Sequence, residues 1–164
     1  MKKVAILMGS DSDLPIVEKC INVLREYEVP HEVHVYSAHR TPVESANFVS
    51  SASDNGFGVI IAAAGMAAHL AGAVAANTVL PVIGIPISCK NTGGMDALLA
   101  TVQMPSGIPV ATVAIDGAAN AALLAIQILS LSEPSLKDKL VLARNEGREK
   151  VLLKNKAVEE KFNK

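Results

Sequence analysis

Several residue types are scarce in this 164-residue chain, and each scarcity excludes a class of protein. Aromatic residues make up 3% of the sequence and tryptophan is absent, so little is present to stack on a flavin ring. The 15 basic and 16 acidic residues nearly cancel and form no basic stripe, so no nucleic-acid partner is expected. No apolar run approaches the roughly 20 residues of a membrane helix, and no secretory leader pattern is present. We therefore expect a cytoplasmic protein without a membrane partner.

Cysteine is scarce as well, and no metal or hydrolase motif is present. Cys20 and Cys89 stand alone, without metal-ligand spacing, so we expect reduced structural thiols. His39 and His69 are not spaced like ligands on one helix face and no acidic or cysteine cluster joins them, so no metal site is predicted. The GSDSD segment lacks the spacing of a dinucleotide or Walker loop. No serine stands in a GxSxG elbow, so nucleophilic hydrolysis has no support.

Aliphatic residues are abundant instead. Half of the chain is hydrophobic and its mean hydropathy is +0.34, with Ala, Val, Ile and Leu supplying most of the surplus. This composition favours a sheet buried on both faces, or helices buried between subunits, or both. The length fits a single domain over residues 1–164.

Apolar runs alternate with helical patterns along the chain. Strands are predicted at residues 3–8, 32–36, 57–64, 81–86 and 109–115, and helices at residues 42–53, 67–74, 96–101 and 120–131 and after residue 13. Asp13 is the predicted N-cap of the first helix, and Thr41, Pro42 and Glu44 form a predicted capping box for the second. The alternation predicts an α/β fold, a three-layer αβα sandwich around a parallel sheet of the flavodoxin or Rossmann kind.

The last predicted helix, residues 134–162, differs from the others. Its apolar positions include Leu136, Leu140, Ala143, Val151 and Leu152, whereas the rest of it is heavily charged. It follows after the elements of the sandwich are complete. We therefore expect it to act as an oligomerisation helix that lies across a neighbouring subunit.

Polar segments follow four of the predicted strands, where the carboxyl ends of a parallel sheet bind ligands. They are residues 9–13, 37–40, 65–69 and 88–94. Together they supply hydroxyls and amides, a cation, carboxylates and histidines, the groups that a phosphosugar site needs. Each could instead be ordinary: GSDSD a tight turn, His39 a solvated turn residue, His69 a helix residue, Arg40 a surface ion pair. The combination favours a site, because Arg40 directly precedes a helix start that would bind phosphate.

The segments GSDSD, SAHRTP, AAGMAAHLAG, LPVIGIP and LLATVQMPSGIPVATVAI resemble, in order, the class I PurE family. The resemblance covers roughly residues 4–129. That family consists of N5-carboxyaminoimidazole ribonucleotide mutases of purine biosynthesis, which convert N5-carboxyaminoimidazole ribonucleotide to 4-carboxy-5-aminoimidazole ribonucleotide. The resemblance implies an isomerase without metal or cofactor, acting by decarboxylation and recarboxylation of a small nucleotide. It also implies a homo-octamer with active sites at subunit interfaces.

The resemblance also assigns roles to residues. His39 would be the catalytic acid and base, and His69 a second active-site histidine. The implied substrate contacts are Ser10, Ser12 and Asp13 for phosphate and ribose, Arg40 for phosphate, and Ser37 with the backbone at Ala64 and Gly65 for the moving carboxylate. Because the CO2 intermediate must be kept from water, we also expect residues 90–95, which contain two glycines, to act as a lid. The turn at Asp116 and Gly117 is shorter than the family's glycine- and lysine-containing turn, so a lysine contact there is not carried over.

Alternatives remain open at this stage. A second group in the same family carboxylates aminoimidazole ribonucleotide with free CO2, but carries lysine where Arg40 stands and lacks the AAGMAAHLAG pattern. A flavodoxin-like mononucleotide-binding module would fit the order of elements. A receiver domain needs an aspartate at the end of a central strand, whereas Ala64 and Gly65 end the third one.

Overall fold

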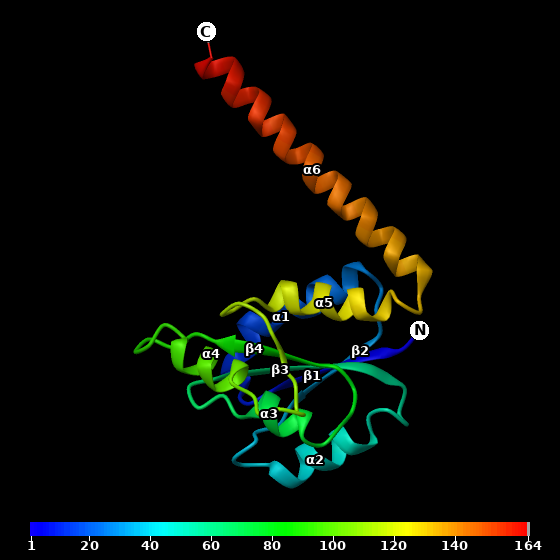
Figure 1. Cartoon of the computed structure of the whole chain (residues 1–164), viewed down its shortest axis with the longest axis vertical. Coiled ribbons are helices and arrows are strands. Elements are labelled where there is room, and N and C mark those ends of the chain that lie inside the picture. The colour runs from blue at the N-terminus through cyan, green and yellow to red at the C-terminus, as the bar shows by residue number, and fades with distance from the viewer. Residues whose placement is uncertain (164) are drawn as a thin grey trace.

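A five-stranded parallel sheet forms the centre of the structure, a computed structural model that describes residues 1–163 (Figure 1). The strands stand in the order β2-β1-β3-β4-β5. Their bounds are β1 Lys3–Met8, β2 His31–Val35, β3 Phe57–Gly65, β4 Val82–Ile87 and β5 Ala111–Thr112. This is the flavodoxin-like order, in which the strand order reverses beside β1 and opens a crevice between β1 and β3.

Helices cover both faces of the sheet, so the predicted three-layer αβα sandwich is confirmed. In Figure 1, α1 and α5 lie on one side of the sheet and α2 and α3 on the other. The helices are α1 Leu14–Glu26, α2 Pro42–Ser51, α3 Leu70–Ala75, α4 Met95–Val102, α5 Ala118–Leu129 and α6 Pro134–Phe162, and a 3-10 turn, η1 Asp11–Asp13, precedes α1.

The alternation of side chains along each strand divides the core in two. One set packs with α1 and α5 and includes Ile6, Ile61 and Ile85, all at most 1% exposed. The other set, with Leu7 and Ile60, packs with α2 and α3 and is equally buried. Burial of alternate residues on both faces explains why the strands read as continuous apolar runs.

Two predicted element boundaries are wrong, each for a local reason. Pairing of the edge strand β5 with β4 is limited to two residues, although Val113 N–H still donates to Gly84 O (3.1 Å). α3 begins at Leu70 rather than residue 67, because Met66 has a φ of 55° and the chain turns sharply there. The predicted start of α1 is confirmed, with Asp13 at the N-cap position, but the Asp13 side chain makes no capping hydrogen bond. The chain is already helical through η1, which Ser10 caps by accepting from Ser12 N–H (3.2 Å).

The last helix leaves the body of the protein. α6 spans 29 residues and projects away from the sandwich (Figure 1), with Leu136 its one residue classed as buried. Its first turns are fixed to the end of α1, where Lys139 Nζ donates to Glu28 Oε2 (2.5 Å) and Tyr27 O (3.3 Å). Its packing on a neighbouring subunit stays a prediction. Of the helices in residues 1–163, none combines the length and apolar character needed to cross a membrane.

The close approach of α4 to β4 generates a stability prediction. A Cβ placed on Gly84 would lie 2.4 Å from Thr101 Cγ2 and 3.1 Å from Val110 Cγ1. We expect Gly84→Ala to destabilise the protein by about 1–3 kcal/mol through overpacking, visible as a melting temperature lower by several degrees. Thr101→Ser removes the obstructing methyl and keeps the hydroxyl that donates to Ala97 O (2.7 Å). The double variant should therefore melt above Gly84→Ala alone; equal melting temperatures would refute the steric explanation.

Candidate active site

The carboxyl ends of β1, β2, β3 and β4 surround a hollow of about 630 Å³. All nine residues that the sequence assigned to a site line it: Ser10, Ser12, Asp13, Ser37, His39, Arg40, Ala64, Gly65 and His69. They come from three separate segments of the chain, at or just after the ends of β1, β2 and β3. The parallel strands bring these segments to one edge, as expected for ligand sites in open α/β sheets.

The loop after β2 is held in shape by its own hydroxyl groups. Ser37 Oγ accepts hydrogen bonds from the backbone N–H of His39 (3.3 Å) and Arg40 (3.2 Å). Thr41 Oγ1 accepts from Ser37 N–H (2.8 Å) and donates to Ser37 O (3.3 Å). The predicted capping box is therefore wrong, because the Thr41 hydroxyl bonds backward to Ser37 and makes no cap to α2. The predicted start of α2 at Pro42 is confirmed.

His39 and His69 lie in direct contact, which the sequence did not reveal. His39 Nε2 is 2.8 Å from His69 Nδ1, and the ring planes are inclined by 71°. Such a bond needs one ring to donate and the other to accept, so at most one of the two facing nitrogens carries a proton. The pair can therefore pass a proton between its rings or orient one ring through the other.

Arg40 and the loop after β1 form another part of the wall of the hollow. An Nη atom of Arg40 donates to Gly9 O (3.3 Å), which places the guanidinium beside the GSDSD segment. Within that segment, Ser12 Oγ donates to Ser10 Oγ (2.8 Å), and the segment leads through η1 into the N-terminus of α1. A cation, two serine hydroxyls and a helix N-terminus are a combination suited to an anion such as phosphate.

Asp13 is the buried charge of the site, with 8% of the residue exposed. Burial raises the pKa of its carboxyl above the usual value of 3.8, and the negative charge of Asp11 adds to the effect. Hydrogen bonds from Ser10 and Ser12 lower the pKa but do not cancel the burial. Keeping this carboxylate ionised in a buried position costs free energy. A residue with this perturbation in a hollow is a candidate for ligand binding rather than for a structural role alone.

The loop after β4 also lines the hollow. The sequence placed residues 88–94 at this edge of the sheet but did not identify individual site residues there. Ile87, Ser88 and Cys89 line the hollow. The expected structural role fits Cys20, which is fully buried and whose pKa burial raises to about 12. Cys89 instead lies in the wall, where hydrogen bonding with Thr92 (Sγ to Oγ1, 3.0 Å) lowers the pKa of its thiol. The position of Cys89 directly after an apolar strand could have indicated that it lies at the ligand-binding edge of the sheet.

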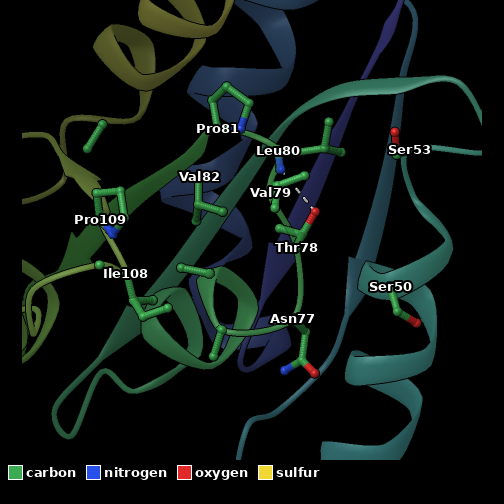
Figure 2. Close-up of a pocket in the computed structure, with 14 residues that line it drawn as sticks. Ser50, Ser53, Asn77, Thr78, Val79, Leu80, Pro81, Val82, Ile108 and Pro109 are labelled. Atoms are coloured by element: carbon green, nitrogen blue, oxygen red, sulfur yellow. Dashed lines mark hydrogen bonds between the residues drawn. The ribbon is translucent and has the colours of Figure 1, made fainter.

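A second hollow, of about 920 Å³, opens before β4 and β5 (Figure 2). Thr78, Val79, Leu80 and Pro109 are among its lining residues, and Thr78 Oγ1 accepts from Leu80 N–H (3.1 Å). Its lining residues include no histidine, acid, lysine or arginine. Despite its larger volume it offers no acid/base group, so the chemistry belongs to the hollow at the carboxyl ends of the strands.

Comparison with known proteins identifies the family of this chain. The family described as AIR carboxylase matches residues 3–150. The chain belongs to the AIR carboxylase family. A relative named N5-carboxyaminoimidazole ribonucleotide mutase from Pyrococcus horikoshii is 53% identical over 157 residues, covering 96% of this chain and 89% of that protein. One of the same name from Aquifex aeolicus is 54% identical over 137 residues, 84% and 82% of the two chains.

A solved structure agrees with the fold. The crystal structure of Treponema denticola PurE superposes with a TM-score of 0.85 at 27% identity and covers 98% of each chain. Within residues 1–163, no group of three or more His, Cys, Asp or Glu side chains is arranged to hold a metal ion.

The raised pKa of Asp13 predicts how stability changes with pH in this member of the AIR carboxylase family. Below the ordinary value of 3.8 the carboxyl is protonated in both states; stability is lost as pH rises through the raised folded-state pKa. Asp13→Asn removes this loss, so the variant should melt above the wild type at neutral pH, and the difference should shrink as pH falls toward 3.8. Asp54→Asn, at an exposed position, is the control. A neutral-pH melting temperature below that of the wild type would contradict the prediction.

Proposed function

We propose that this chain is an N5-carboxyaminoimidazole ribonucleotide mutase, an isomerase that converts N5-carboxyaminoimidazole ribonucleotide to 4-carboxy-5-aminoimidazole ribonucleotide. The observation that carries the proposal is the His39–His69 pair, in one hollow with an arginine and a serine-rich helix start. Support comes from relatives of that name that are more than half identical over most of both chains.

The nucleotide binds with its phosphate between Arg40 and the start of α1. The guanidinium forms charge-assisted hydrogen bonds to the phosphate oxygens, and the hydroxyls of Ser10 and Ser12 lie beside them. The Asp13 carboxylate accepts hydrogen bonds from ribose hydroxyls, which partly replace the water that burial removes. This anchors the end of the substrate that does not react and leaves the imidazole ring near the histidines.

The reaction moves the carboxylate from N5 to C4 of the imidazole, and the proton that His39 donates is returned to it. The bond between N5 and the carboxylate carbon breaks, CO2 leaves, and protonated His39 gives a proton to N5. The C4 carbon then attacks CO2 and forms the new carbon–carbon bond, after which His39 removes the proton from C4. His39 ends the cycle protonated, as it began, so no outside acid, base, oxidant or reductant is consumed.

His69 supports the proton transfer through its contact with His39. When His39 carries protons on both nitrogens, its Nε2–H donates to His69 Nδ1, which fixes the ring and leaves the other N–H directed elsewhere. The two facing nitrogens cannot both present a proton at the 2.8 Å contact, so one ring donates to the other.

The released CO2 has to be retained until C4 attacks it. Ala64 and Gly65, the last two residues of β3, give the hollow a small, apolar lining. The Ser37 hydroxyl accepts two amide hydrogen bonds but keeps its own O–H to donate to a carboxylate. Residues 90–95 are the proposed lid, which with a neighbouring subunit excludes water.

The assignment predicts conversion of N5-carboxyaminoimidazole ribonucleotide without added bicarbonate, measured by the formation of the C4-carboxylated product. His39→Asn should abolish turnover, a loss of at least about a hundredfold, while isothermal titration still detects substrate binding. Thr78→Ala, in the hollow at the other end of the sheet, should leave turnover unchanged. Full activity of His39→Asn would refute its role.

A second candidate is carboxylation of aminoimidazole ribonucleotide by free CO2, the activity in the family's description. The same assay separates the two reactions. Turnover only of aminoimidazole ribonucleotide, and only with high bicarbonate, would overturn the mutase proposal. Arg40 and the AAGMAAHLAG segment favour the mutase.

Assembly as a homo-octamer in the cytoplasm is part of the proposal, with α6 packed on a neighbouring subunit. The outer half of α6 exposes large apolar side chains, among them Val151 (64%), Leu153 (68%) and Phe162 (68%). An isolated charged helix with such residues on its surface gains free energy by burying them against another subunit.

The role of α6 is tested by placing charge on its apolar positions. Val151→Glu combined with Leu153→Glu should dissociate the octamer in light scattering and reduce activity, because the proposed sites lie at subunit interfaces. Lys154→Glu changes charge on the same helix without removing an apolar side chain and should keep the assembly. A wild type that is monomeric, or a double variant that stays octameric, would contradict this role.

A further inference from the structure

Asp116 makes an unusual pair of bonds to the end of β4. Its backbone N–H donates to Pro86 O (2.9 Å), and its side-chain Oδ1 accepts from Ser88 N–H (2.9 Å). The two bonds lie on either side of Ile87, the last residue of β4. β5 stops pairing after Thr112, so the Asp116 side chain supplies an acceptor at a position where a longer neighbouring strand would supply a carbonyl.

The backbone of Asp116 is held in the left-handed region, with a φ of 56°. Most side chains are disfavoured there, whereas aspartate and asparagine tolerate it comparatively well. Gly117 N–H donates to Ala114 O (2.8 Å) and Ala118 N–H to Asp116 O (2.9 Å), so the turn is bonded on both sides of the strained residue. The surrounding hydrogen bonds therefore fix where the carboxylate points.

The residue that Asp116 holds is the first of the loop that walls the candidate active site. Ser88 lines the same hollow as the histidine pair, together with Ile87 and Cys89. Its N–H is taken by the carboxylate and is not free for a ligand. What Asp116 controls is therefore the position of the wall, and the carboxylate itself is not among the residues that line the hollow.

The far end of this loop is fixed independently. Thr92 Oγ1 donates to Asp96 Oδ1 (2.6 Å) in the first turn of α4. Gly94, with a φ of 92°, packs so closely on Ser88 that an added Cβ would lie 3.0 Å from the Ser88 Cα. The loop from Ser88 to Gly94 thus closes on itself, and the bond at Ser88 ties its start to the turn at Asp116.

We propose that Asp116 is a positioning residue for the mutase reaction: its carboxylate anchors the Ser88–Gly94 loop as one wall of the substrate hollow without touching the substrate. The inference rests on the proposed function. Loss of the anchor leaves the exposed Ser88 N–H to bond with water and frees the wall, so substrate binding weakens while the His39 chemistry is affected less.

Three variants distinguish the effect of the Asp116 carboxylate from that of its left-handed backbone. Asp116→Gly keeps the left-handed φ and removes the acceptor, and Asp116→Ala removes the acceptor without easing the backbone. Both should raise KM on the order of tenfold, with a smaller change in kcat. Asp116→Asn keeps an acceptor oxygen at the same reach and tolerates the left-handed backbone, so its KM should stay within about twofold of the wild type. Asp54→Ala, at the opposite end of the sheet, is the matched control.

Hydrogen exchange provides a readout that needs no substrate. The Ser88 amide of the full-length protein should exchange faster in Asp116→Gly and Asp116→Ala and should stay protected in Asp116→Asn. A wild type inactive on N5-carboxyaminoimidazole ribonucleotide would overturn the proposed function, and the exchange result would still decide whether Asp116 anchors the loop. An active Asp116→Gly with wild-type KM and a protected Ser88 amide would overturn the inference, as would an Asp116→Asn whose KM matches that of Asp116→Ala.

Discussion

The parallel pairing of β1 with both β2 and β3 is the constraint on which the site depends. Met8 pairs with Val35 on one side and Ala63 on the other, and Ala63 pairs with Ile85. The four strands therefore end at nearly the same level, and the loops that follow them emerge side by side. Since helices cover both faces of the sheet, this edge is where polar groups from distant parts of the chain can meet in a crevice.

At that edge, a side chain that could cap a helix instead holds a loop of the candidate site in shape. Thr41 precedes Pro42 and would cap α2 in an ordinary helix start, but its hydroxyl bonds to the backbone of Ser37. That bond, with the two amides that Ser37 Oγ accepts, fixes the turn that carries His39 and Arg40. The hydrogen bond that a cap would contribute to α2 is exchanged for a rigid presentation of the two residues.

The sequence predicts those parts of the structure that depend on local patterns, and it does not predict contacts between distant residues. Apolar runs predict β1, β3 and β4 to within a residue or two, because burial on both faces leaves a continuous pattern. β5 pairs over two residues at the sheet edge, and no pattern in its longer apolar run indicates this. The motifs predicted which residues line the site. The contact between His39 and His69 joins residues thirty positions apart, and local propensity carries no information about such a contact.

Unfavourable features are concentrated around the same hollow. Three non-glycine residues within 1–163 have positive φ. Two of them, Met66 and Asp116, flank the site, while Glu28 lies just after the end of α1. Left-handed backbone costs about 1–2 kcal/mol for an ordinary side chain, and the buried Asp13 carboxylate adds to this cost. A chain optimised for folding alone would avoid these choices. They persist because the two buried faces of the sheet stabilise the body enough to hold strained loops in place, which is how a rigid parallel sheet can present a demanding site at its edge.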